Sequence, residues 1–276
     1  MACALALGLT LTGVAAAQTT VCGNNNLGPL GDQKQYIFLG DQWNKQFAKV
    51  KQCLQVTDSH EPAPHGPSSV YTGEPFQNTT WTPSDYPDFL YGCFHGTCTE
   101  NTHLPIQVSH LDDWSITSGE TVVQPAGFNN DMAYDIWFNQ GPESPIDKNT
   151  TGTELMIWVQ HSGPAQPIGK PAAQYTDTRG HHWTAWVGPN TGNCNCQGPG
   201  SQVISFVNDD GHGATKGTTY DLNLNDFFHV ALKLGQIQPS WYLTTVEFGT
   251  EIWVGGPGLR VDNFWVKVEP KTAAPQ

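Results

Sequence analysis

Short stretches of apolar and polar residues recur along the 276-residue chain, separated by clusters of Gly, Pro, Asn and Asp. The stretches are rich in Val, Ile, Tyr, Phe and Trp, which favour β-strands. The strands predicted in this way are 36–43, 133–138, 154–160, 182–187, 202–207, 243–254 and 259–268. Their spacing is typical of an all-β sandwich or barrel.

One segment, 224–234, has the period of an amphipathic helix. Its apolar residues recur at spacings of three and four, and Gly235 stands in the stop position. The apolar face consists of Leu224, Phe227, Phe228, Ala231 and Leu234. We expect one short helix that packs this face against the sandwich.

The first 17 residues predict a signal peptide. An apolar run ends at the small residues Ala15 and Ala17, as cleavage requires, and is too short to span a bilayer. No internal repeat or Ser/Thr/Pro-rich linker divides the rest of the sequence. We therefore expect a secreted protein in which residues 18–276 form a single domain.

Six cysteines remain once Cys3 leaves with the signal peptide, and an even number in an exported chain predicts disulfides. They are Cys22, Cys53, Cys93, Cys98, Cys194 and Cys196. Zinc is the alternative ligand, but neither of the two closely spaced pairs has a well-spaced second pair beside it. We expect disulfides, with pairing between near neighbours as the simplest arrangement, and no metal.

Charge and composition limit the chemical class of the binding partner. The chain has 12 Lys and Arg against 25 Asp and Glu, a formal charge of −13, which disfavours nucleic acid and anionic membranes. Its 10 Trp, 8 Tyr and 12 Phe stand beside many Asn, Gln, Thr and Ser residues. This mixture suits an uncharged ligand covered with hydroxyl groups, such as a sugar polymer. We expect a monomer that needs no cofactor.

Carboxylates share strand faces with tryptophans in three of the predicted strands. Residues two apart along a strand lie on the same face. In 154–160, Glu154 shares its face with Met156 and Trp158, while the intervening apolar residues belong to the core. The corresponding faces of the other two strands carry Glu247, Glu251 and Trp253, and Asp135 and Trp137.

Paired carboxylates among aromatic side chains are what glycoside hydrolysis requires. One carboxyl group protonates the departing oxygen, and the other attacks the anomeric carbon or activates a water molecule. Indole faces hold the apolar face of a pyranose ring. Each acid alone could be an edge-strand charge that discourages aggregation, but their recurrence on three strands favours a sugar-processing β-sandwich.

Five motifs that follow one another along the chain sharpen this hypothesis. They are Tyr134-Asp-Ile-Trp, Glu154-Leu-Met-Ile-Trp, Gln166-Pro-Ile-Gly, Val203-Ile-Ser-Phe-Val and Gly249-Thr-Glu-Ile-Trp. In this order they resemble glycoside hydrolase family 12, the small endo-β-1,4-glucanases, and the match runs from about Cys22 to Val268. The resemblance implies a β-jelly roll of two antiparallel sheets, whose concave sheet forms an open glucan-binding cleft.

The resemblance also implies roles for individual residues in a retaining double displacement. Glu154 takes the position of the nucleophile, Glu251 that of the acid/base, and Asp135 that of the Asp which hydrogen-bonds the nucleophile. Glu247 lies about 13 Å along the strand from Glu251, and we expect it to take no part in the reaction. The expected substrate-binding residues are Trp43, Met156, Trp158 and Trp253.

Two other functions fit part of these observations. A jelly-roll xylanase also uses two glutamates, but the Glu154-Leu-Met-Ile-Trp string disfavours it. A non-catalytic sugar-binding protein on the same fold would need neither glutamate. The segment 208–213 could bind calcium, but it lacks EF-hand spacing. We expect hydrolysis of cellulose, mixed-linkage β-glucan or xyloglucan without a metal.

The sequons that begin at Asn78 and Asn149 could carry glycans if the host is a eukaryote. Both are Asn-Thr-Thr, and Thr-rich turns explain them equally well.

Overall fold

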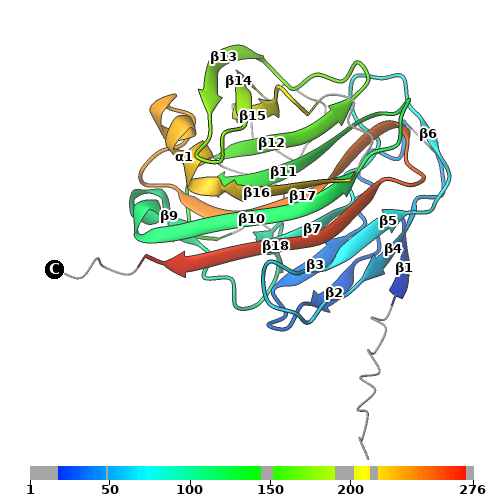
Figure 1. The fold of residues 1–276 in the computed structure, drawn as a ribbon, viewed down its shortest axis with the longest axis horizontal. Helices are drawn as coiled ribbons and strands as arrows, with labels where there is room; N and C mark the ends of the chain where they lie inside the picture. Colours follow the sequence, from blue (N-terminus) through cyan, green and yellow to red (C-terminus); the bar gives the residue numbers. More distant parts are fainter. Residues whose placement is uncertain (1–17, 48, 144–151, 190–201, 212–216, 272–276) are drawn as a thin grey trace, which may run out of the picture.

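The computed structural model describes residues 18–47, 49–143, 152–189, 202–211 and 217–271. Two β-sheets form two layers, seen one in front of the other in Figure 1. The smaller sheet contains, in spatial order, β1 (Gln18–Cys22), β4 (Cys53–Thr57), β5 (Ser68–Tyr71), β18 (Arg260–Pro270), β10 (Trp114–Val123) and β16 (Thr218–Asn223). The predicted β-sandwich is therefore confirmed.

The larger sheet holds the strands that carry the predicted site. Its spatial order is β13 (Lys170–Thr176), β14 (His182–Pro189), β15 (Gln202–Asn208), β12 (Thr153–Ser162), β11 (Asn129–Asn139), β17 (Tyr242–Gly255), β7 (Asp88–Phe94), β3 (Tyr36–Leu39) and β2 (Leu27–Leu30). Three short strands extend this path: β6 (Phe76–Gln77) and β9 (Ile106–Gln107) pair with β17, and β8 (Thr97–Cys98) pairs with β7.

One strand pair departs from the expected antiparallel pattern. Strands β12 and β15 run parallel, whereas the other pairs are antiparallel. After β12 the chain runs out to the edge of the sheet, forms β13 and β14, and returns as β15 beside β12. Two antiparallel pairings, β13 with β14 and β14 with β15, make β15 run in the same direction as β13, and both run parallel to β12.

The main core lies between the two sheets and is lined by alternate residues of the long strands, as predicted. It includes Leu155 and Ile157 of β12 and Val246, Phe248 and Ile252 of β17, all fully or almost fully buried. Because these residues face the core, the residues between them face the opposite side of the larger sheet.

Two helices complete the fold, a 3-10 helix η1 (Val108–Asp113) and the predicted helix α1 (Leu224–Lys233). Helix α1 lies at one end of the sandwich (Figure 1) and buries four of its five predicted apolar residues. Phe228 of α1 meets Phe138 of β11 edge to face, with ring centroids 5.3 Å apart. Gly235 follows with a φ of +70°, the left-handed conformation that ends helices.

Two disulfides link neighbouring strands within the sheets. Cys22 and Cys53 are register partners on β1 and β4, and Cys93 and Cys98 are partners on β7 and β8. Disulfides at these four positions are confirmed. The predicted signal peptide, Asn149, and Cys194 and Cys196 lie outside the described residues. Over the described part of the chain, no helix is long and apolar enough to span a membrane.

Strand β3 is shorter than predicted because the chain turns away after Leu39. A Cβ on Gly40 would lie 1.9 Å from the carbonyl oxygen of Gly23, so the backbone can approach only because residue 40 is glycine. Asp41 follows with a φ of +28°. Trp43 therefore lies in the loop after β3.

Candidate active site

The central strand of the site is β11, which is flanked by β12 on one side and β17 on the other. Across β11 and β12, Trp137 pairs with Glu154 and Asp135 with Met156. Across β11 and β17, Asp131 pairs with Glu251. We call this side of the larger sheet, which faces away from the main core, the site face.

An apolar floor covers part of the site face. Met156 and Trp158 pack together in a cluster separate from the main core, with Trp186 of β14 packed against it. The other buried members are Ala133, Val203 and Val207. Trp158 is only 2% exposed, and Trp186 is the more exposed of the two indoles. Trp186 is thus an aromatic residue of the site face that the sequence did not single out.

Glu154 and Glu251, the two predicted catalytic acids, both lie on the site face. Part of each residue reaches solvent. Protein nevertheless surrounds the Glu251 carboxyl, and burial raises its pKa well above the ordinary range. The negative charges of Asp131 and Glu154 raise this pKa further. The structure therefore brings the two acids close enough for one charge to act on the other.

Asp135 lies between these two glutamates and is 7% exposed. Burial raises its pKa well above the ordinary range, and the charges of Glu154 and Glu251 add to that shift. A raised pKa keeps Asp135 protonated over the acid range. In that form its carboxyl can donate a hydrogen bond, whereas a carboxylate can only accept one.

Glu247 is closer to the predicted site than its distance along the strand suggested. It pairs with Asp135 across β11 and β17 and is 2% exposed. Burial raises its pKa, and the charges of Asp41 and Glu154 contribute. The expected separation of Glu247 from Glu251 along β17 did not take account of β12, whose Glu154 is near enough for its charge to act on Glu247. Glu247 is therefore not a remote control residue.

Further buried acids surround the predicted pair. Asp85 and Asp131 are 0% exposed and Asp88 is 1% exposed. Burial raises the pKa of all three carboxyls, and the charge of Glu251 contributes at Asp85. The sequence analysis missed them, although Asp131 has a simple signal. It lies four residues before Asp135, on the same face once β11 is extended beyond its predicted start.

The two remaining predicted binding residues lie in the loop after β3 and near the end of β17. Trp43 is partly buried in the loop after β3. Trp253 of β17 is 4% exposed, and its Nε1 donates a hydrogen bond to the carbonyl oxygen of Trp81, 3.0 Å away. Trp81 itself is 92% exposed. Trp81 therefore presents most of the aromatic surface of this pair. It was not among the binding residues predicted from the sequence.

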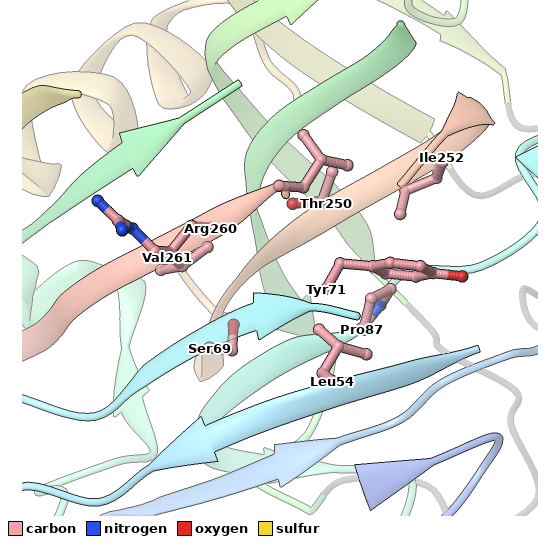
Figure 2. A pocket seen from close by; sticks show the side chains of 9 residues that line it. Leu54, Ser69, Tyr71, Pro87, Thr250, Ile252, Arg260 and Val261 are labelled. Carbon is pink, nitrogen blue, oxygen red and sulfur yellow. The ribbon is translucent and has the colours of Figure 1, made fainter. Parts of the chain in front are cut away.

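Two hollows elsewhere in the structure are separate from the site face. Figure 2 shows a cavity of about 10 Å³ whose lining includes Thr250 and Ile252 of β17, together with residues of β4, β5 and β18. Because these two residues alternate with Glu251, the cavity faces the core side of β17. A second hollow of about 270 Å³ lies between β13 and α1.

No group of three or more His, Cys, Asp or Glu side chains in the described ranges has the geometry to hold a metal ion. The turn after β15, considered for calcium, is partly described. There, Asn208 accepts a hydrogen bond from the backbone N–H of Asp210, and Asp209 accepts one from the Thr184 hydroxyl. These contacts account for the polar side chains as parts of a hydrogen-bonded turn.

Comparison with known proteins agrees with this geometry. The model of glycosyl hydrolase family 12 matches residues 34–269. Endoglucanase S of Pectobacterium parmentieri is 30% identical over 248 residues, covering 87% of this chain and 83% of that protein. Xyloglucan-specific endo-beta-1,4-glucanase A of Aspergillus niger is 28% identical over 280 residues, covering 96% and 99%.

Among solved structures, endoglucanase cel12A from Rhodothermus marinus matches with a TM-score of 0.73 and 26% identity, covering 92% of this chain and 100% of that one. Both the sequence and the fold thus agree over most of the chain with the resemblance that the five motifs suggested. The protein belongs to glycosyl hydrolase family 12.

Proposed function

We propose that the protein is an endo-acting β-1,4-glucanase that hydrolyses its substrate with retention of configuration. The observation that carries the proposal is that Glu154 and Glu251 share one sheet face, on the two strands that flank β11, and that the charge of Glu154 raises the pKa of Glu251. Family membership and the names of the relatives support the substrate class. Cellulose, mixed-linkage β-glucan and xyloglucan are the candidate polymers.

In the first step, Glu251 donates its proton to the glycosidic oxygen while the Glu154 carboxylate attacks the anomeric carbon. The raised pKa of Glu251 suits this role, because a general acid must be protonated when the bond breaks. Asp135, protonated beside the nucleophile, would donate a hydrogen bond and hold Glu154 in its ionised form. The leaving chain departs, and a covalent glycosyl ester forms at Glu154.

In the second step, Glu251 is ionised and takes a proton from an incoming water molecule. The water oxygen attacks the anomeric carbon, the ester bond to Glu154 breaks, and the product leaves with the β-configuration. A retaining enzyme of this kind holds its two carboxyl groups about 5–5.5 Å apart, against roughly 6.5–9.5 Å in an inverting enzyme.

The test replaces each proposed catalytic acid by its uncharged amide. We expect Glu154→Gln and Glu251→Gln to lose nearly all hydrolysis of soluble β-glucan while circular dichroism shows an unchanged fold. Glu269→Gln, an exposed residue of β18 in the other sheet, is the matched control. Rates equal to wild type in either site variant would refute the assignment. Proton NMR of early products should show the β-anomer first.

The polymer specificity is tested by product analysis. Mass spectrometry after incubation with cellulose, mixed-linkage β-glucan, xyloglucan and xylan separates the candidates. Cleavage of xylan alone would favour the jelly-roll xylanase. Specific binding without cleavage of any of the four polymers would favour a non-catalytic sugar-binding protein.

We also propose that the protein is secreted as a monomer, with residues 1–17 as signal peptide and 18–276 as one catalytic domain. The two disulfides support export, since such bonds persist in oxidising compartments. N-terminal sequencing of protein recovered from the medium should begin at Gln18. Size-exclusion chromatography with light scattering should give the mass of one chain.

A further inference from the structure

One aromatic residue of the described chain stands out by its exposure. Trp81 is 92% exposed, whereas the other exposed large apolar side chains, Phe47, Ile168 and Leu232, are 42%, 40% and 38% exposed. Removal of apolar surface from water is the main force in folding, yet folding leaves this indole in solvent. Trp81 lies in the segment 78–84, which we call the rim loop.

The rim loop is firmly held against the end of β17. The backbone N–H of Asn78 donates to the Trp253 carbonyl (2.8 Å) and that of Ser84 to the Ile252 carbonyl (2.9 Å). The Asn78 side chain, 2% exposed, donates from Nδ2 to the Thr82 carbonyl (2.8 Å) and the Ser84 hydroxyl (3.0 Å). These bonds hold the loop in one conformation, so the exposed indole is carried on an ordered support.

The position of the rim loop places Trp81 at the acid/base end of the site face. The Trp81 carbonyl accepts the hydrogen bond from Trp253, which lies two residues beyond Glu251 on β17, at a β-bulge opposite β11. Two strand residues correspond to about 7 Å. Along β11, Glu251 lies opposite Asp131, whereas Glu154 lies opposite Trp137, six residues further on. A polysaccharide that continues past Glu251, away from Glu154, therefore runs towards Trp81.

A glucosyl unit offers a ligand of the right chemistry for such an indole. Each β-1,4-linked unit presents an apolar face of C–H groups with hydroxyls at its edge, and an exposed indole provides a flat, rigid, apolar partner. Trp253 cannot provide this surface alone, because it is 4% exposed.

We propose that Trp81 forms an additional sugar-binding position, in which its indole stacks on a glucosyl unit of the leaving-group part of the polymer. The inference rests on the proposed function, because it takes Glu251 as the acid that faces the leaving group. A long chain reaches this position, whereas a disaccharide bound at the acids ends before it. Trp81 therefore contributes to the preference for polymers over short oligosaccharides.

The test measures binding separately from hydrolysis. In a Glu154→Gln background, isothermal titration calorimetry gives the Kd of cellohexaose and of cellobiose, with and without Trp81→Ala. We expect Trp81→Ala to raise the cellohexaose Kd about three- to tenfold, and the cellobiose Kd much less. Trp81→Phe should restore most of the affinity. Leu232→Ala, which removes an exposed apolar side chain on α1, is the matched control and should leave the Kd unchanged.

Equal cellohexaose affinity in the Trp81→Ala variant and its parent would overturn the inference, as would a parent that binds no cellohexaose. Hydrolysis of polymers by the wild-type protein tests the proposed function independently. If the wild type hydrolyses polymers but Trp81→Ala changes no Kd, only the additional sugar-binding position is refuted. If the wild type hydrolyses nothing but Trp81→Ala weakens binding of the long chain, only the catalytic assignment is refuted.

Discussion

Glu120 is a buried carboxyl far from any proposed chemistry, and replacing it should stabilise the protein at neutral pH. It lies on β10, is 1% exposed and accepts a hydrogen bond from the Tyr134 hydroxyl. Burial raises its pKa from 4.5 to about 8. The folded protein therefore holds a proton on Glu120 at pH 7 that the unfolded chain has released.

The size of the effect follows from the two pKa values. The Glu120 pKa is about 8 in the folded protein and 4.5 in the unfolded chain. Below pH 4.5 the group costs no folding stability, and the cost grows as the pH rises from 4.5 towards about 8. At pH 7 the loss amounts to about 3 kcal/mol from this group alone. The glutamine in Glu120→Gln cannot ionise, and its amide oxygen can still accept a hydrogen bond from the Tyr134 hydroxyl. The variant therefore removes this loss of stability.

Urea unfolding with the disulfides intact, at pH 4 and pH 7, provides the measurement. Wild type and Glu120→Gln should have similar unfolding free energies at pH 4, and the variant should be more stable at pH 7 by about 3 kcal/mol. The unfolding free energy of Glu269→Gln should lie within about 0.5 kcal/mol of the wild-type value at both pH 4 and pH 7. If Glu120→Gln loses as much stability as wild type between pH 4 and pH 7, the reasoning is refuted.

Three further predictions concern the site acids and the disulfides. Asp135→Asn should keep its fold and move the acid limb of the activity profile to lower pH, because the amide always donates to Glu154 and carries no charge; an unchanged profile and rate would show that the two are not coupled. Glu247→Gln should keep most activity, since burial raises the Glu247 pKa and favours the uncharged form that the amide resembles. A more than tenfold loss in initial rates would mean that Glu247 acts in the reaction. Replacing the disulfide between β1 and β4 (sequence separation 31) by alanines should lower the unfolding free energy in urea by about 4 kcal/mol, against about 2 kcal/mol for the disulfide between β7 and β8 (separation 5). The longer loop gains more conformational freedom in the unfolded chain. Equal losses of unfolding free energy would contradict this.

The sequence predicted those parts of the structure that depend on local alternation. The core faces of β12 and β17 follow directly from the spacing of Leu155, Ile157, Phe248 and Ile252, because a buried face leaves only one register. Helix α1 was predictable for the same reason, since its apolar stripe needs a partner surface. The acid-bearing faces could then be read as the opposite sides of these elements.

The features that arise between distant strands could not be predicted in this way. The proximity of Glu247 to Glu154 depends on the order β12–β11–β17, which no local pattern encodes. The parallel pairing of β12 with β15 likewise depends on where the chain re-enters the sheet. Asn78 illustrates a similar limit: its sequon suggested a glycan or a turn, and its buried, donating Nδ2 shows that it organises a turn.

Because of the strand order around β11, the site is complete only when the last strands of the chain have folded. Strands β11 and β12 are neighbours in the sequence, within residues 129–162, whereas β17 begins only at residue 242. The nucleophile strand thus pairs early through a local contact, while the acid strand closes a loop of about a hundred residues, a slow non-local event. A chain that stops before β17 carries Glu154 and the apolar floor but lacks Glu251. Cleavage of polysaccharide therefore requires that nearly the whole chain has been made and that its last strands are docked.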